Sequence, residues 1–452
     1  MWAGTEYFMI MKKILFFLLL TQIGYSQIWK PLGHRFLYLG VFDFRNFNNQ
    51  LFVAGDYTAD SSNLNNIARW NGSDWQPLDS GMLGGVYAME EFNGELHIGG
   101  YFYNINNISN TRKIARWDGA TFHALAKGIT SGGQVNVMLS YNGNLYAGGD
   151  FQTVDSLPIH TIAKWNGVAW SPVCNITGTF AMVESMAIYN GDLYIGGYFT
   201  GINGQPMRNI ARFDGSSWSA VGDGLSSDVY ALVVDSATNR LYAAGNFTST
   251  GTGAIVFPSN VAYWDGAVWT PVGSGPSLSP TSLTIYKNQI YVGGYFSWIN
   301  NIVNSSGDTL NFICKWDGND WQPLGKGVNT SIQALYVFNN DLIVGGGITM
   351  AGDSVVNLVA AYTDTTASVR ELNAVKQGIK ITPSPTKNSI AVTSPVAVTA
   401  YSITSPTGQI IKKQNQKLLK EFSVDTSALP GGLYIFTATM GKQSVSIKFA
   451  KE

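Results

Sequence analysis

The sequence is poor in charged residues, in cysteine and in histidine. Charged residues make up 13% of the 452 residues, and the formal net charge is −1. A chain with so little net charge offers no basic field for nucleic acid. Its two cysteines are too few for a disulfide framework, and its four histidines form no His-x-x-His pair of the kind that binds zinc. We therefore expect no nucleic-acid partner, no bound metal and no cofactor.

Long hydrophobic runs are also missing. The apolar run at 14–20 follows Lys12 and Lys13 and is too short to cross a bilayer as a helix. A basic start, a short apolar run and small polar residues are typical of a signal peptide. We expect a signal peptide over residues 1–26, with Met11 as the translation start and cleavage near Ser26. No later segment is long and apolar enough for a transmembrane helix.

Glycine and aromatic residues are abundant. The chain has 50 glycines, its aromatic content is 13%, and 45% of its residues are hydrophobic. This balance favours an all-β protein with many tight turns.

A repeat of about 48 residues dominates the chain. Seven segments that end in a Gly-Gly-aromatic pattern, or a close variant of it, align with one another, and their ends are 45 to 52 residues apart. They occupy residues 48–57, 93–102, 142–151, 190–199, 238–247, 287–296 and 339–348. Each is followed by a segment resembling Ile-Ala-Arg-Trp-Asp-Gly, at 67–72, 114–119, 162–167, 210–215, 261–266, 313–318 and, in decayed form, 359–364. Repeats of this period indicate a propeller or a solenoid.

Each repeat predicts four antiparallel strands. An apolar strand leads through an Asn-Gly turn into the Gly-Gly strand, a polar loop follows, and Asp-Gly or Asn-Gly joins the third strand to a fourth. Four such strands make one propeller blade. Proline recurs two residues after tryptophan in the fourth strands, at Pro31, Pro77, Pro172, Pro271 and Pro323. Because proline cannot donate to a sheet ladder, we expect the fourth strand to be the outer edge of each blade.

The last repeat lacks a fourth strand, and an isolated copy, IWKPLG (28–33), stands near the start. We therefore predict an all-β chain with a seven-bladed β-propeller over 27–364, closed by this N-terminal strand. An open solenoid would need capping repeats instead. The alignment places Cys174 and Cys314 in distant blades, so we expect two separate thiols.

The repeats resemble those of secreted kelch-like, galactose-oxidase-type propellers. In that resemblance the recurring Gly, Trp and Asp residues are structural. A residue repeated in every blade is a building part, since one site rarely needs seven copies.

The segment after residue 378 has a different pattern, with alternating strands that predict a small β-sandwich over 379–452, after a linker at 365–378. It resembles the type A C-terminal sorting domain of the type IX secretion system of Bacteroidetes. The residues that carry this resemblance are Pro383, Pro385, Thr407, Gly408, Leu429, Pro430, Gly432 and Tyr434. Pro383-Ser384-Pro385 departs from the usual Pro-Asn-Pro opening. The alternative is an ordinary fibronectin-like sandwich.

The sorting resemblance implies export by the type IX machinery and a place outside the cell, secreted or attached to the outer cell surface. For the propeller itself we expect a monomeric binding or interaction module for a glycan or a protein. A glycan-active enzyme, sialidase-like or another propeller hydrolase or lyase, is the first alternative, although no catalytic residue stands out in the sequence. A structural or adhesion component of the surface is the second.

The loops between second and third strands share one face with the blade-to-blade connections, and loops on a rigid scaffold commonly carry recognition. Aromatic and amide side chains gather in two of them. These candidate ligand-binding residues are Tyr103, Asn104, Asn106, Trp298, Asn300 and Asn301. The alternative is that the asparagines serve turn geometry.

Overall fold

The computed structural model describes residues 27–33, 36–59, 65–79, 82–273, 279–296, 303–364, 380–382, 386–394, 397–405, 410–414, 420–440 and 443–451. The predicted signal peptide, the linker, Trp298, Asn300, Asn301, Pro383, Pro385, Thr407 and Gly408 lie outside these residues. The chain divides into two compact units, Met1–Thr366 and Ala367–Glu452.

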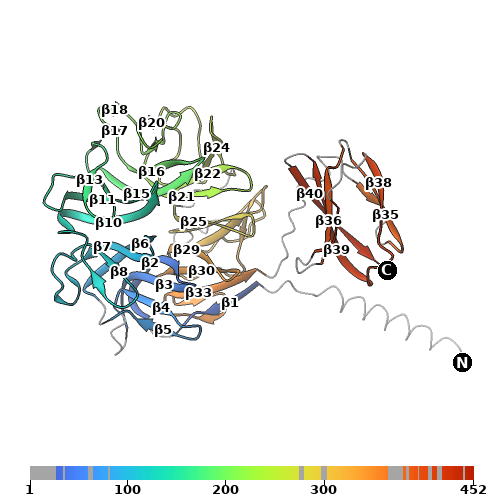
Figure 1. The fold of residues 1–452 in the computed structure, drawn as a ribbon, viewed down its shortest axis with the longest axis horizontal. Helices are drawn as coiled ribbons and strands as arrows, with labels where there is room; N and C mark the ends of the chain where they lie inside the picture. Colours follow the sequence, from blue (N-terminus) through green and yellow to red (C-terminus); the bar gives the residue numbers. More distant parts are fainter. Residues whose placement is uncertain are drawn as a thin grey trace, which may run out of the picture. The chain divides into compact units, whose positions relative to one another are not determined.

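The first unit holds seven four-stranded antiparallel sheets, the blades, which follow one another in chain order around a common centre (Figure 1). The first strand of each blade contacts the first strand of the next, and the last contacts the first, so the ring is closed. These innermost strands are β2 (Phe36–Phe47), β6 (Gly84–Phe92), β10 (Ile129–Tyr141), β15 (Met182–Tyr189), β21 (Val229–Asp235), β25 (Pro280–Tyr286) and β29 (Ile332–Phe338).

The second and third strands follow outward in every blade. The second strands are β3 (Gln50–Ala59), β7 (Glu95–Phe102), β11 (Asn144–Val154), β16 (Asp192–Tyr198), β22 (Arg240–Gly245), β26 (Gln289–Gly294) and β30 (Asp341–Gly346). The third strands are β4 (Ile67–Trp70), β8 (Ile114–Trp117), β12 (Ile162–Trp165), β19 (Ile210–Phe213), β23 (Val261–Trp264), β27 (Ile313–Trp316) and β33 (Val359–Asp364).

The fourth strands form the outer edges, and five of them contain the recurring proline. They are β5 (Trp75–Pro77), β9 (Phe122–His123), β13 (Trp170–Pro172), β20 (Trp218–Ala220), β24 (Trp269–Pro271), β28 (Trp321–Pro323) and, for the seventh blade, β1 (Gln27–Pro31). The predicted closure is confirmed, because β1 pairs antiparallel with β33, with Trp29 opposite Tyr362. Figure 1 shows this N-terminal strand completing the last blade.

Shorter elements decorate the connections between these strands. They are a 3₁₀ turn at Ile105–Asn107, a small sheet of β14 (Ile176–Thr177), β17 (Gly201–Ile202) and β18 (Gln205–Pro206), and the pair β31 (Met350–Ala351) and β32 (Ser354–Val355).

The core of the propeller consists of seven apolar layers, one between each pair of adjacent blades. Each layer joins residues of one blade to residues of the next; Ala88 and Phe92 of the second blade, for example, cluster with Val135 and Leu145 of the third. Tryptophan of a third strand also packs on the fourth-strand aromatic of its blade, as in Trp70 with Trp75, whose ring centroids are 5.1 Å apart. Burial of this aromatic area holds the blades together.

The cysteines are separate, as expected: Cys314 is buried and Cys174 is half-buried, and both are free thiols.

The second unit is a small sandwich of two sheets that share one apolar cluster. One sheet contains β34 (Lys380–Thr382), β35 (Ser389–Thr393) and β38 (Glu421–Asp425), and the other contains β37 (Ile410–Gln414), β36 (Ala400–Thr404), β39 (Gly432–Met440) and β40 (Gln443–Lys451). Period-two alternation in β35 and β36 points their apolar side chains into this shared cluster.

Candidate functional site

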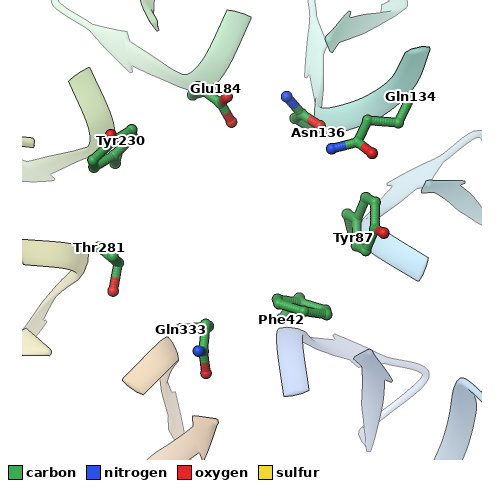
Figure 2. A pocket seen from close by; sticks show the side chains of 8 residues that line it. All are labelled: Phe42, Tyr87, Gln134, Asn136, Glu184, Tyr230, Thr281 and Gln333. Carbon is green, nitrogen blue, oxygen red and sulfur yellow. The ribbon is translucent and has the colours of Figure 1, made fainter. Parts of the chain in front are cut away.

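A pocket of about 450 Å³ lies at the axis of the propeller, where the innermost strands of all seven blades meet (Figure 2). Aromatic and amide side chains dominate its wall, together with one carboxyl and one hydroxyl group. The lining residues are Phe42, Tyr87, Gln134, Asn136, Glu184, Tyr230, Thr281 and Gln333. All eight side chains are half-buried.

A β-bulge in every innermost strand places these side chains. In the first blade Val41 pairs with Gly55 and Asp43 with Ala54, so Phe42 between them has no partner in the ladder. The same shift of register recurs in all seven blades, and the skipped residues are Phe42, Tyr87, Asn136, Glu184, Tyr230, Thr281 and Gln333. Because a bulge re-aims the extra side chain, the repeat converts one position per blade into a wall of the pocket.

The repeated Gly-Gly pair accompanies the bulge. A Cβ on the second glycine would meet the carbonyl oxygen two residues before the bulge, at 2.2 Å for Gly55 against Gly40 and at 1.9 Å for Gly149 against Gln134. A Cβ on the first glycine would instead meet the next blade, as at Gly99 against Val135. The second glycine is therefore needed for close approach within the blade, whereas the first position also accepts alanine, as at Ala54 and Ala244.

Glu184 has an unusual electrostatic environment. Burial raises its pKa to about 7, and the negative charges of Asp150 and Asp228 act in the same direction, while a hydrogen bond from Asn136 opposes them. Glu184 therefore exchanges its proton near neutral pH. It can present either a carboxylate acceptor or a carboxylic-acid donor to a ligand.

Two aromatic rings lie on the side of the pocket opposite Glu184. Phe42 and Tyr87 meet edge to face, with ring centroids 5.2 Å apart, and Figure 2 shows them across the opening from Glu184 and Tyr230. The Tyr230 hydroxyl accepts a 2.6 Å hydrogen bond from Asn246 Nδ2. Two apolar ring faces, amide groups and one titratable carboxyl can thus bind a ligand that has both C–H faces and hydroxyl groups.

The pocket wall lies near the face that the sequence predicted for recognition. Each bulge lies in the part of the first strand that pairs with the end of the second strand, and so near the loop to the third strand. The blade-to-blade connections enter at this same face.

The predicted loop residues that the structure describes lie apart from the pocket wall. Tyr103, Asn104 and Asn106 follow β7, and the Tyr103 side chain is exposed, with the Arg112 guanidinium 6.0 Å from its ring centroid. Asn106 adopts a φ of 49° and its side chain donates to Asp79. Their role in binding stays a prediction, and turn geometry accounts for part of the asparagine content.

The other repeated polar residues have structural partners. The Asp118 carboxylate accepts hydrogen bonds from the backbone of Ala120 and Thr121, both at 2.8 Å, and Asp214, Asp265 and Asp317 make equivalent turns. The recurring basic side chain of the third strand forms ion pairs, Arg116 with Glu95, Arg212 with Asp192 and Lys315 with Asp364. Within the described residues no group of three or more His, Cys, Asp and Glu side chains is placed to hold a metal ion.

In the C-terminal unit, four of the sorting-signal residues lie at the entry to β39: Leu429, Pro430, Gly432 and Tyr434. The Tyr434 hydroxyl donates a 2.9 Å hydrogen bond to the Pro430 carbonyl, and Tyr434 stacks on Phe449 at 5.7 Å between ring centroids. Leu429 precedes them in a turn closed by its backbone N–H to Thr426 at 3.0 Å. The Leu-Pro-Gly-Gly-Leu-Tyr element thus fixes how the chain enters the central strand of the larger sheet.

Residues 380–452 match the family described as the secretion system C-terminal sorting domain. Domains of this kind mark proteins for export, through type IX secretion, to the cell surface or the extracellular space. The protein is therefore an exported one. The described part of the chain contains no helix with the length and hydropathy needed to cross a bilayer.

Similar solved structures are remote. PorZ, a surface component of the type IX secretion system of Porphyromonas gingivalis, is 13% identical, with a TM-score of 0.35 over 90% of this chain and 64% of the PorZ chain. The GH74 enzyme of Niastella koreensis is 13% identical, with a TM-score of 0.39 over 92% of this chain and 73% of that one. A putative 6-phosphogluconolactonase of Bacteroides fragilis is 12% identical, with a TM-score of 0.36 over 85% and 100%.

The chain thus spans less than two thirds of the PorZ chain, and likenesses this distant carry no argument about activity. No curated protein matches the chain in sequence.

Proposed function

We propose that the exported propeller is a binding module that holds a neutral, hydroxyl-rich ligand, a glycan, in its axial pocket. One observation carries this proposal: all seven blades place a bulge residue around the same opening, and the wall they form combines aromatic rings with amide groups. The resemblance of the repeats to kelch-like propellers stays a prediction, and the proposal does not depend on it.

The chemistry of the wall supports a sugar over an anion. None of the eight lining residues is lysine or arginine, so the wall supplies no cation for a phosphate or carboxylate group. Phe42 and Tyr87 offer apolar faces for the C–H side of a sugar ring, while Gln134, Asn136 and Gln333 can bind its hydroxyl groups. A cavity of about 450 Å³ suits a ligand of the size of a small oligosaccharide.

The experiment is a glycan-array screen of the full secreted chain, followed by titration calorimetry on each binder. Tyr87→Ala and Gln333→Ala should each weaken binding by about tenfold or more, since each removes a wall contact. Asn104→Ala, in the loop after β7, should leave affinity unchanged. Loss of binding in the loop variant with retention in both pocket variants would move the site to the loops and overturn the axial proposal.

A glycan-active enzyme is the second candidate, and the raised pKa of Glu184 favours it. A carboxyl group whose pKa is about 7 is suited to act as a general acid on a glycosidic oxygen. The same array binders are incubated with the protein and assayed for released sugar ends. Product that disappears in Glu184→Gln would assign the enzyme; binding without product assigns the binding module. Silence in both assays would favour a protein partner or a structural role at the surface.

For the rest of the chain we propose a propeller over 27–364, a linker over 365–378 and a sorting domain over 379–452 that engages the type IX machinery. The division into two compact units and the sorting match at 380–452 support these boundaries.

A further inference from the structure

A second cavity of about 530 Å³ lies on the same face of the propeller, between the third and fourth blades. Its wall combines polar side chains with one exposed aromatic ring. The residues used below are Asp150, Gln152, His160, Asn175, Phe180 and Met182.

This cavity adjoins the axial pocket. The Asp150 carboxylate, part of its wall, accepts a 2.6 Å hydrogen bond from the backbone N–H of Gln134, whose side chain lines the axial pocket. On the other side Met182 lines the second cavity, two residues before Glu184 of the axial wall in β15. The negative charge of Asp150 also acts on Glu184. The two cavities therefore share part of their wall, and the second cavity lies farther from the axis than the first.

The outer wall of the second cavity is a structured connection. The blade-to-blade segment before β15 contains β14, which pairs with β17, and β17 pairs with β18. The backbone N–H of Thr200 donates to Thr177 at 2.8 Å, and Asn175 and Asn203 are joined by two hydrogen bonds of 2.8 Å. Among the described residues no other blade carries a three-stranded addition of this kind. The cavity is thus preformed.

Phe180 stands at the edge of this connection in a costly conformation. Its backbone φ is 62°, in the left-handed region that bulky residues rarely adopt, and its side chain is 81% exposed. An aromatic ring that is neither buried in the core nor favoured by its backbone is a candidate for ligand contact.

We infer that an extended glycan runs from the axial pocket across this second cavity, with Phe180 as a stacking platform for an outer sugar residue. The inference rests on the proposed function and deepens it, because it assigns a glycan chain that extends beyond the axial pocket. Asn175, Gln152 and Asp150 supply hydrogen-bonding groups along the path, beside His160, while Glu184 and the other bulge residues hold the axial end.

The test uses oligosaccharide ladders, from disaccharide to hexasaccharide, of glucan, xylan and mannan, titrated against the full secreted chain. The hexasaccharide should bind wild type about tenfold more tightly than the disaccharide. Phe180→Ala should remove this gain and leave disaccharide affinity unchanged. Val168→Ala is the matched control, because Val168 is 82% exposed but lies in a turn between third and fourth strands. It should behave as wild type.

The outcomes separate the inference from the function it rests on. If oligosaccharides of every length bind tightly and Phe180→Ala has no effect, the extended path is wrong, while the proposed axial site is unaffected. An equal loss at every length would also overturn it, because Phe180 would then act on the axial end or on the fold. No binding of any ladder to wild type would overturn both.

Discussion

Single residues decide how closely the strands of a blade approach. In the first blade a Cβ on Gly55 would lie 2.2 Å from the Gly40 carbonyl oxygen, whereas a Cβ on Gly40 would meet nothing closer than 3.6 Å. The two glycines lie on neighbouring rungs of the same ladder, because Gly40 pairs with Asp56 and Gly55 with Val41.

Gly55→Ala should lower the free energy of unfolding by about 1–3 kcal/mol, because the backbone of β2 must move to admit the methyl group. Gly40→Ala should change it by less than about 0.5 kcal/mol. Denaturant unfolding followed by tryptophan fluorescence measures both. Equal effects would mean that the close approach at Gly55 is not what selects glycine there.

His97 in β7 makes stability depend on pH. It is buried, 1% exposed, and burial lowers its pKa from 6.5 to about 4, with the nearby Arg116 charge acting in the same direction against a backbone contact to Glu95. The unfolded chain takes up a proton near pH 6.5 and the folded chain only near pH 4. Stability from this group is therefore complete above pH 6.5 and is lost as the pH falls between these values.

Between pH 7 and pH 5 the free energy of unfolding of His97→Met should fall by about 2 kcal/mol less than that of wild type. The comparison with the variant is needed because Asp43 acts in the opposite sense. Burial raises its folded pKa from 3.8 to about 6, so acidification through that window favours the folded state. Parallel pH profiles for wild type and variant would contradict the role of His97.

At the scale of the element, the fourth strands of four blades are hydrogen-bonded to the blade before them. The indole N–H of Trp170 donates to the Leu125 carbonyl of the preceding blade at 3.2 Å, and Trp29, Trp75 and Trp269 make the equivalent bond. The indole nitrogen of Trp321 is buried and has no hydrogen-bond partner within the described residues. The fourth-strand tryptophan thus occurs both with this indole hydrogen bond and without it.

Trp170→Phe should destabilise the protein by about 1 kcal/mol more than Trp321→Phe, since only the first change leaves a carbonyl oxygen without its donor. Both variants keep an aromatic ring, and both positions are buried in wild type. Thermal unfolding of the two proteins side by side gives the difference. A larger loss in Trp321→Phe would show that ring area, and not the bond, controls this contact.

The strands show which features of the fold and the site could be predicted from the sequence and which could not. The turns with asparagine, aspartate and glycine, the glycine pairs and the edge prolines recur in most blades, so the strand order and the closure by 28–33 could be predicted from them. The pocket residues could not, because Phe42, Glu184 and Thr281 occupy equivalent positions yet share no chemistry. Only the register between the first and second strands reveals the bulge, and register is a property of the folded sheet.

At the scale of the whole molecule, closure of the ring depends on β1 and on Asp364, the last residue of β33. Asp364, opposite Gln27, binds Lys315 at 2.8 Å and accepts a hydrogen bond from Tyr291 at 3.2 Å, both from the sixth blade. Trp29 donates to Leu324 of that same blade at 3.1 Å. The seventh blade is therefore joined to the sixth through the strand supplied by the other end of the chain.

A secreted chain that begins at residue 36 should lose this closure. It exposes the edge of β33, so we expect a clearly lower melting temperature and self-association through that edge. Size-exclusion chromatography with light scattering, together with thermal unfolding, measures both effects. A truncated chain that stays monomeric at the wild-type melting temperature would show that the ring closes without β1.

The bulge has a consequence for how this architecture diversifies. The skipped residue of each innermost strand makes no ladder pair, while the glycines and tryptophans around it carry the packing. Ligand preference and scaffold integrity are thus assigned to different positions of the repeat. Seven positions, one from each blade, can therefore vary independently while the rest of the repeat stays the same. A library randomised at these seven positions alone should yield folded propellers with new ligand specificities.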